Sequence, residues 1–323
     1  MQAACQARRS KSEKYEMTPR TAAPRVCVGH RQPVAGALLF ASFLAYLFAP
    51  TTAHADEPAQ AGELAWNPSW PEFRPSEFVL TGVAGAASLA AYFMLTAPSS
   101  PHWTGGILLD NVLRDDLRLR SPRLRDAART ASDVTAVSAV VIAVGVDSIV
   151  VPLLRHKPSV AQQLVLMDAE SFAISTLLTT TLLERIGRGR PSYADCQRDP
   201  SFDPLCKSGA TSSFPSGHTN AAFTAAGLSC AHHLHLALYG NHTADVLACA
   251  GEIALAGATG GLRVVGDRHY ATDVWAGAII GFGLGYGMPT LLHYGKSGRG
   301  MEASLTVQPV AAGFPGPTVS GTF

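Results

Sequence analysis

The chain has 323 residues, of which 47% are hydrophobic and 15% are charged, and its formal net charge is only +1. This length and composition suffice for one domain with a sizeable core. The charge is unevenly placed, because residues 1–55 hold seven Lys/Arg and two Asp/Glu, and the remainder holds 18 basic and 22 acidic side chains. A protein that binds nucleic acid would need a stripe of basic residues, and this charge distribution does not suggest one, so we expect no nucleic-acid partner.

The first 55 residues have the composition of an export signal. Basic residues precede an apolar run over residues 34–48, and an Ala-x-Ala tripeptide follows at residues 53–55. These are the three features that a signal peptidase reads. We therefore predict a signal peptide and pre-sequence over residues 1–55, with an uncleaved membrane anchor as the alternative.

A polar segment, residues 56–76, leads into six apolar stretches. They cover residues 77–97, 133–155, 161–186, 219–240, 244–262 and 271–292. All are rich in small and aliphatic residues and too long for strands, and no strand-like alternation is present. We predict an all-α fold, a helical bundle over residues 77–295, followed by a disordered tail over residues 296–323.

The segment between the first two stretches, residues 99–132, has a different character. Six arginines alternate with aspartates there, and leucines recur every three to four residues. This pattern predicts one or two amphipathic helices, which either lie on a membrane surface or present a solvated face.

Two stretches, residues 78–97 and 274–292, are uncharged and long enough to span a membrane. The second carries glycines at small-xxx-small spacing, which lets helices approach closely. The other four stretches contain ionisable residues, which are costly in lipid. We predict a membrane-embedded bundle, with a soluble bundle as the alternative.

Four cysteines follow the predicted signal. Cys196 and Cys206 bracket a short polar segment, and a disulfide between them would fit an oxidising compartment, although sequence alone does not establish connectivity. Cys230 and Cys249 lie in predicted apolar helices, where we expect buried thiols.

Three short motifs hold the residues that could do chemistry. They are G-R-G-R-P at residues 187–191, F-P-S-G-H-T at residues 214–219, and R-x5-H-x3-D over residues 263–273. Each lies at the end of a predicted helix, and an even number of helices separates one motif from the next. A bundle would therefore bring all three to one face.

The residue types in these motifs suit an oxyanion. Arg190 and Arg263 can donate forked, charge-assisted hydrogen bonds to phosphoryl oxygens. Ser216 and Gly217 open a helix after a proline, so backbone N–H groups and the positive end of the helix dipole can face an anion.

Two histidines supply the remaining chemistry. His269 and Asp273 are four residues apart, so the carboxylate can hold the Nδ1–H group and leave Nε2 free to attack. His218 is suited to donate a proton to a leaving oxygen.

Taken singly, each motif could be a basic helix end, a turn before a capped helix or an ion pair. Their joint occurrence, in order, favours a phosphate site.

In these motifs the chain resembles the type 2 phosphatidic acid phosphatase and vanadium-dependent haloperoxidase superfamily, whose signature is Lys-x6-Arg-Pro, Pro-Ser-Gly-His and Ser-Arg-x5-His-x3-Asp. The resemblance covers residues 165–290 and implies an all-α phosphatase that needs no metal or other cofactor. Carried over by position, it implies His269 as the nucleophile, Asp273 as its orienting residue and His218 as the general acid. It further implies that phosphate is bound by Arg190, Arg263, Ser216 and Gly217.

Two positions depart from the signature. The motif lysine falls at Leu183, which cannot bind phosphate, and Leu262 replaces the serine of the third motif. We predict that Arg188 binds phosphate in place of the lysine, with Arg185 as the alternative. Loss of one such donor typically lowers a rate by about a hundredfold or more, so reduced or absent activity is compatible with this sequence.

The sequence thus predicts a phosphatase that hydrolyses phosphate monoesters through a phosphohistidine. Its substrate could be a lipid phosphate, such as phosphatidate or isoprenyl pyrophosphate, or a small phosphomonoester. One alternative is a catalytically silent membrane protein that binds phosphate or phospholipid headgroups. Another is a vanadate-dependent haloperoxidase, a class that relies on the lysine missing here.

The likeness of residues 267–273 to the exported bacterial branch implies an inner-membrane protein whose site faces the periplasm, or a periplasmic protein. Three spans before the site would instead place it in the cytoplasm, where the arginine-rich segment 99–132 would also satisfy the positive-inside rule. The Cys196–Cys206 pair favours the external site, which we predict.

Overall fold

The computed structural model describes residues 63–206, 209–295, 304–306 and 318–320, all within one compact unit, Pro50–Phe323. The signal peptide and pre-sequence predicted at residues 1–55 therefore lie outside the described residues. Most of the tail predicted to be disordered, residues 296–323, lies outside them as well.

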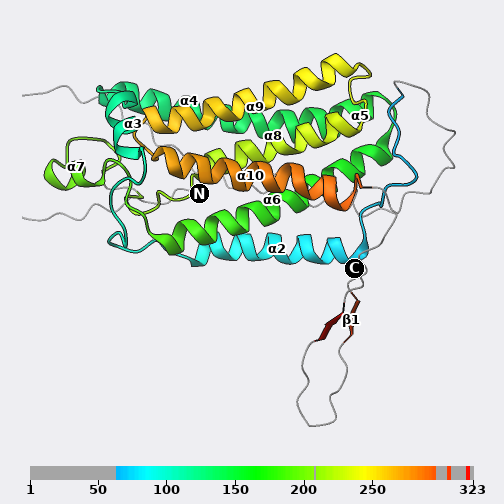
Figure 1. The fold of residues 1–323 in the computed structure, drawn as a ribbon, viewed down its shortest axis with the longest axis horizontal. Helices are drawn as coiled ribbons and strands as arrows, with labels where there is room; N and C mark the ends of the chain where they lie inside the picture. Colours follow the sequence, from blue (N-terminus) through cyan, green and yellow to red (C-terminus); the bar gives the residue numbers. More distant parts are fainter. Residues whose placement is uncertain (1–62, 207–208, 296–303, 307–317, 321–323) are drawn as a thin grey trace, which may run out of the picture. The chain divides into compact units, whose positions relative to one another are not determined.

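The described residues form a bundle of long helices, which Figure 1 shows running side by side. Its elements are α2 (Pro75–Met94), α4 (Pro122–Val140), the π-helix η1 (Val141–Val150), α5 (Val151–Leu154), α6 (Pro158–Ile186), α8 (Gly217–His235), α9 (His242–Val265) and α10 (Ala271–Leu292). Two short helices, α3 (Asp110–Leu117) and α7 (Tyr193–Arg198), lie in the connections. The predicted all-α fold is confirmed.

The described part of the tail forms two short strands, β1 (Ser304–Thr306) and β2 (Thr318–Ser320). They pair antiparallel, with Ser304 opposite Ser320. Strands of three residues are too short to show an alternation of polar and apolar side chains, so the sequence pattern could not predict them.

Each of the six predicted apolar stretches corresponds to a helix or to a run of helices. The largest difference concerns the stretch predicted at residues 133–155, whose helix begins at Pro122 and becomes a π-helix at Val141. The earlier start was missed because residues 122–132 are rich in arginine. The amphipathic segment 99–132 therefore contains both α3 and the first turns of α4.

Helices α8 and α10 approach each other closely because glycines line their contact. A Cβ atom at Gly277, Gly281 or Gly285 would lie 2.6, 2.3 or 2.2 Å from a backbone oxygen of α8 or of its N-cap residue. Only glycine permits this approach, as the small-xxx-small spacing predicted. The contact holds the two helix N-termini together, and the Ser216 N–H group donates to the Asp273 backbone oxygen at 3.0 Å.

Two disulfides are present among the described cysteines. Cys196 and Cys206 are joined, with a Cα–Cα distance of 5.3 Å, as the sequence suggested. The buried thiols predicted at Cys230 and Cys249 are wrong, because these residues are also joined, at a Cα–Cα distance of 4.4 Å. This disulfide connects α8 to α9. It can form only when particular faces of the two helices meet, and the pattern of apolar residues does not specify those faces.

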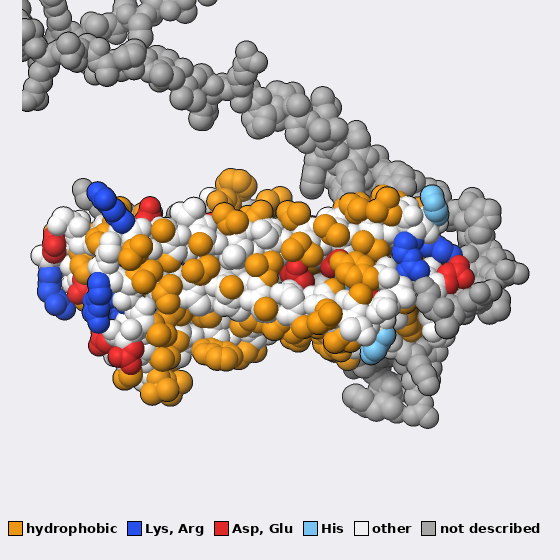
Figure 2. Space-filling model, turned by 90° about the horizontal axis from the view of Figure 1, so that it is seen from above, with side chains coloured by type: hydrophobic (Ala, Val, Ile, Leu, Met, Phe, Trp, Pro, Cys, Tyr) orange, Lys and Arg blue, Asp and Glu red, His pale blue; other side chains and the backbone are white. Residues whose placement is uncertain are grey.

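Four described segments are long and apolar enough to cross a membrane, namely α2, Pro122–Leu154, α9 and α10. Large apolar side chains such as Leu80, Val137 and Ile279 are exposed on them. Figure 2 shows hydrophobic side chains along the length of the bundle, while most charged side chains on that face gather near its ends. This distribution indicates a membrane protein.

Candidate active site

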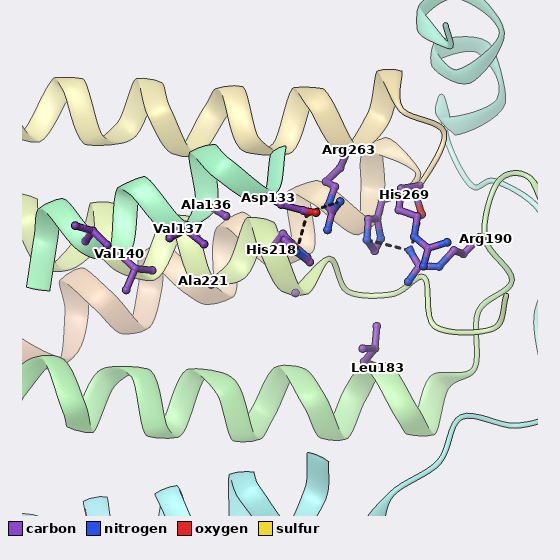
Figure 3. A pocket seen from close by; sticks show the side chains of 13 residues that line it. Asp133, Ala136, Val137, Val140, Leu183, Arg190, His218, Ala221, Arg263 and His269 are labelled. Atoms are coloured by element: carbon purple, nitrogen blue, oxygen red, sulfur yellow. Dashed lines mark hydrogen bonds and ion pairs between the residues drawn. The ribbon is translucent and has the colours of Figure 1, made fainter. Parts of the chain in front are cut away.

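A cavity of about 590 Å³ lies at one end of the bundle, between the helices and the loops that join them (Figure 3). Its lining combines a polar part with an apolar wall. The polar part consists of Asp133, Arg190, His218, Arg263, Arg268 and His269. The apolar wall is formed by side chains of α4, η1, α6 and α8.

The three sequence motifs meet at this cavity through the ends of their helices. Helix α6 stops at Gly187, whose φ of 61° is left-handed, and the chain then turns so that Arg190 reaches the cavity. His218 lies in the first turn of α8 and Arg263 in the last turn of α9. His269 lies in the loop before α10. The predicted convergence of the motifs is therefore present in the structure.

His269 is buried, and both of its ring nitrogens have close neighbours. Its Nδ1–H group donates to the backbone oxygen of Ser213 at 2.7 Å, which leaves Nε2 as the nitrogen with a lone pair. Nε2 lies 3.1 Å from Nη1 of Arg190, inside the cavity. Burial and the charges of Arg190 and Arg263 lower the pKa of His269 well below its ordinary value. The imidazole is therefore neutral, which is the form that can act as a nucleophile.

The sequence predicted a direct hydrogen bond from His269 to Asp273, and this detail is wrong. The nearest carboxylate oxygen of Asp273 is 3.9 Å from Nδ1. Helix α10 begins at Ala271, so His269 precedes the helix and does not share a helical face with Asp273. Asp273 acts through Ser213 instead, because it accepts a hydrogen bond of 2.6 Å from the Ser213 hydroxyl. Ser213 was not singled out from the sequence.

Arg188 does not reach the cavity, contrary to the phosphate-binding position predicted for it. Its side chain is fully buried, and its guanidinium lies between two carboxylates, 2.8 Å from Asp110 and 2.5 Å from Asp273. Trp103 and Tyr270 cover the faces of the guanidinium. Arg188 therefore holds Asp273 and is not placed to meet a phosphate in the cavity. The alternative residue, Arg185, is not among the cavity-lining residues either.

Arg268 lines the cavity although no role was predicted for it. It precedes His269 in the third motif, and that adjacency was the only sequence signal for it. Burial and the neighbouring charges of Arg129 and Arg263 lower the pKa of Arg268 to about 10. The pKa of Arg190 is likewise lowered, by burial and by the charges of Arg268 and Arg263. Three guanidinium groups crowded at one cavity create a site that favours an anion.

Ser216 and Gly217 form the start of α8, as predicted. Ser216 is the N-cap residue, and its buried hydroxyl pairs with the hydroxyl of Thr219 at 2.9 Å, away from the cavity. Gly217 lines the cavity, so the first backbone N–H groups of α8 lie beside it. The contribution of Ser216 is therefore through the helix terminus and not through its side chain.

Asp133 is a second residue that the motifs did not reveal. It comes from α4, and its Oδ1 atom lies 3.1 Å from Nε2 of His218 and 3.1 Å from Nη1 of Arg263. Figure 3 shows this carboxylate between the two side chains. Nothing local marks residue 133, because its place in the site depends on how α4 packs against α8 and α9.

The donors that face the cavity are cationic or neutral nitrogen groups, with Asp133 as the one carboxylate among the lining residues. Among the described residues, no group of three or more His, Cys, Asp or Glu side chains is arranged to hold a metal ion. The arrangement can bind a tetrahedral oxyanion beside a neutral imidazole, with the imidazole of His218 in the same lining.

Comparisons with known proteins give one match. A model of the PAP2 superfamily matches residues 166–296, which contain all three motifs together with α7, α8, α9 and α10. No curated protein and no solved structure matches the chain. Helix α4, which contributes Asp133, lies before the matched range.

Proposed function

We propose that the chain hydrolyses phosphate monoesters through a phosphohistidine intermediate, a proposal that starts from the match of residues 166–296 to the PAP2 superfamily, the family that the three motifs predicted. The superfamily supports an activity of the phosphatase or haloperoxidase type in general. The observation that carries the narrower proposal is the meeting of His269, His218 and three arginines at one cavity.

Phosphate binding falls to Arg190, Arg263, Arg268 and the N-terminus of α8. Guanidinium groups bind phosphoryl oxygens through paired, charge-assisted hydrogen bonds, and helix N-termini add backbone donors. Arg268 supplies the positive charge that the motif lysine would have brought, because Leu183 stands in the lysine's position on the cavity wall. We therefore assign Arg268, and not Arg188, to the role of the missing residue.

The first chemical step is attack by Nε2 of His269 on phosphorus. The P–N bond forms as the ester P–O bond breaks, and the proton of His218 passes to the leaving oxygen. Burial and the charge of Arg263 lower the pKa of His218 to about 4 in the free protein, so the step needs the negative charge of the bound phosphate to raise this pKa and keep His218 protonated. Water then attacks the phosphohistidine, His218 takes a proton from that water, and the P–N bond breaks to release phosphate. Asp273 and Ser213 keep Nδ1 protonated and the ring oriented throughout.

Asp133 pairs with two side chains that a bound substrate would contact. It pairs with His218 and with Arg263 at the same distance, 3.1 Å. A bound phosphate would take over the donors of Arg263 and would bring the leaving oxygen to His218. Asp133 therefore holds both side chains in place before the substrate arrives.

The apolar wall favours a lipid phosphate over a small phosphomonoester. Beyond the arginines the cavity is lined by aliphatic side chains, among them Ala136, Val137, Val140 and Leu183. Such a wall can accept the hydrocarbon part of a substrate whose phosphate lies beside His269. The presence of Leu183 in place of the motif lysine therefore has two consequences: the site loses a positive charge, and the apolar wall is extended.

A catalytically silent phosphate-binding protein is the second candidate, and Leu183 is the observation that favours it. The arginine cluster would bind a phospholipid headgroup even if the chemistry were lost. Steady-state turnover of any phosphomonoester excludes this candidate.

For location, we propose a membrane-embedded bundle over residues 77–295 whose site faces the periplasm. The two disulfides support an oxidising compartment around their cysteines. The four membrane-capable segments support a membrane-embedded bundle over a soluble one.

Hydrolysis by the purified protein in detergent tests the proposal. We expect release of phosphate from phosphatidate and from p-nitrophenyl phosphate, with a higher kcat/KM for the lipid. Vanadate, which mimics a pentacoordinate phosphoryl group, should inhibit both reactions. If the protein binds vanadate but releases no phosphate from either substrate, the silent-binder function replaces this one.

The lowered pKa of His269 predicts how the activity depends on pH. The nucleophile is lost when the ring is protonated, so a lowered pKa moves the acidic loss of kcat/KM to well below pH 6.5, the usual midpoint of a histidine. Arg190→Gln removes a nearby positive charge and should move that acidic limb to higher pH. The exposed Arg198→Gln is the matched control and should leave the limb in place. An acidic limb near pH 6.5 in the unsubstituted protein would contradict the prediction.

A further inference from the structure

The loop before α3 and the first turn of that helix carry an apolar surface at the cavity end of the bundle. Ile107, Leu108 and Leu109 expose 42%, 90% and 64% of their surfaces, and Val112 exposes 57%. Leu108 has a φ of 52°, a left-handed conformation that leucine rarely adopts. The fold thus directs this side chain outward at a conformational cost. We refer to residues 107–112 as the apolar loop.

One residue of the apolar loop points inward and fixes it to α10. Asp110 is only 1% exposed, and its carboxylate accepts hydrogen bonds from the Thr272 hydroxyl at 2.6 Å and from the Thr272 N–H group at 2.9 Å. It also accepts a bond of 3.0 Å from the N–H group of Ile107. The loop therefore has an anchored inner side and an exposed apolar outer side.

The anchor of the apolar loop is connected to the residues that orient His269. Arg188 donates to Asp110 at 2.8 Å and to Asp273 at 2.5 Å. Asp273 in turn accepts from the hydroxyl of Ser213, whose backbone oxygen holds Nδ1 of His269. A continuous chain of buried hydrogen bonds thus runs from the apolar loop to the imidazole.

The surroundings of the apolar loop point to a lipid bilayer as its partner. The loop lies between two membrane-capable segments, α2 and Pro122–Leu154. The chain after α2 runs along the cavity end of α6, where the His102 N–H group donates to the Gly187 backbone oxygen at 3.0 Å. Exposed aromatic rings, Tyr92 and Phe93, lie in the last turn of α2, as is typical where a span meets the interface.

The charged side chains near the apolar loop do not indicate a partner of opposite charge. The exposed charged residues that follow it carry both signs, with Asp115 and Asp116 opposed by Arg120 and Arg123. A surface that offers exposed leucines and no excess of exposed basic side chains is suited to contact acyl chains, whatever the lipid headgroups.

We propose that residues 107–112 insert into the interfacial layer of the membrane, and that Asp110 and Arg188 fix Asp273 and His269 relative to this contact. Bilayer contact then sets the depth of the cavity, so that the phosphate of a membrane lipid meets the arginines. This inference rests on the proposed function and specifies how that site selects a lipid in a membrane. Asp110 and Arg188 are positioning residues, since neither lines the cavity.

Spin labels test the membrane contact without any turnover. The background carries Cys5→Ser and Cys27→Ser, so that the spin label reacts only with the introduced cysteine. A nitroxide at Leu108→Cys is compared with one at Asp116→Cys, an exposed residue of α3. In phosphatidylcholine nanodiscs we expect the label at position 108 to be accessible to oxygen and shielded from a water-soluble nickel chelate. The label at position 116 should show the reverse. Equal access of the nickel chelate to both labels would overturn the proposal.

Kinetics separate membrane contact from positioning. Leu108→Ser with Leu109→Ser should raise KM for phosphatidate in vesicles by about tenfold and leave hydrolysis of p-nitrophenyl phosphate within about twofold. Leu154→Ser, at an exposed leucine of α5, is the matched control and should change neither. Equal losses with both substrates, or no loss with either, would contradict a membrane-contact role.

Asp110→Asn should lower kcat for both substrates by about tenfold while KM for p-nitrophenyl phosphate and vanadate affinity stay unchanged. A loss of vanadate affinity equal to the loss in kcat would contradict positioning and indicate a general structural defect. If the unsubstituted protein shows no turnover, the proposed function fails, whereas the spin-label result still decides the membrane contact.

Discussion

His269→Ala is expected to lower kcat for every phosphomonoester substrate by at least about 10⁴-fold. The substitution removes Nε2, the ring nitrogen that lies 3.1 Å from Nη1 of Arg190 in the cavity, so the proposed covalent intermediate cannot form. Steady-state phosphate release is the measurement, and His242→Ala, at an exposed histidine of α9, is the matched control.

Loss of activity in His269→Ala should not come from loss of the anion site. Arg190, Arg263 and Arg268 remain, so the variant should still bind vanadate. A variant that retains more than about a hundredth of the activity would contradict the assignment of the nucleophile.

Arg268→Ala is expected to lower kcat/KM by about a hundredfold, the usual effect of removing one donor to a charged transition state. The reason is that Arg268 replaces the lysine that is absent at position 183. A second substitution tests this directly, because Leu183→Lys in the Arg268→Ala background should recover about tenfold or more of the lost activity.

The matched control for Arg268 is Arg198→Ala, which removes an exposed arginine outside the cavity. It should leave kcat/KM unchanged, and Leu183→Lys should have no rescuing effect in that background. If Arg268→Ala keeps full activity, or if Leu183→Lys restores nothing, Arg268 does not stand in for the lysine.

The helices and the meeting of the motifs could be predicted because both depend on local pattern. Long apolar stretches without strand alternation specify helices, and the parity of helices between motifs specifies which ends meet. Gly277, Gly281 and Gly285 could likewise be interpreted from spacing alone, since small residues every four positions allow close helix contact.

Predictions failed where a side chain's direction depends on the backbone around it. Arg188 and Arg190 are two residues apart, yet the left-handed turn at Gly187 sends Arg188 into a buried ion pair and Arg190 into the cavity. His269 and Asp273 have helical spacing, but the helix starts after His269, so Ser213 intervenes.

Other residues of the site depend on packing between distant elements. Asp133 reaches His218 and Arg263 only because α4 lies against α8 and α9. The Cys230–Cys249 pair needs the particular faces by which α8 and α9 meet. No motif in one sequence encodes such contacts, so the structure was required to find them.

Trapping the phosphoenzyme tests the central claim most directly. The purified protein is mixed with a labelled phosphomonoester, quenched in alkali within a single turnover and digested for mass spectrometry. We predict a phosphoryl group on the peptide that contains His269, stable in alkali, labile in acid and absent from His269→Ala. Phosphate release without this adduct, or an adduct on another residue, would contradict the phosphohistidine mechanism.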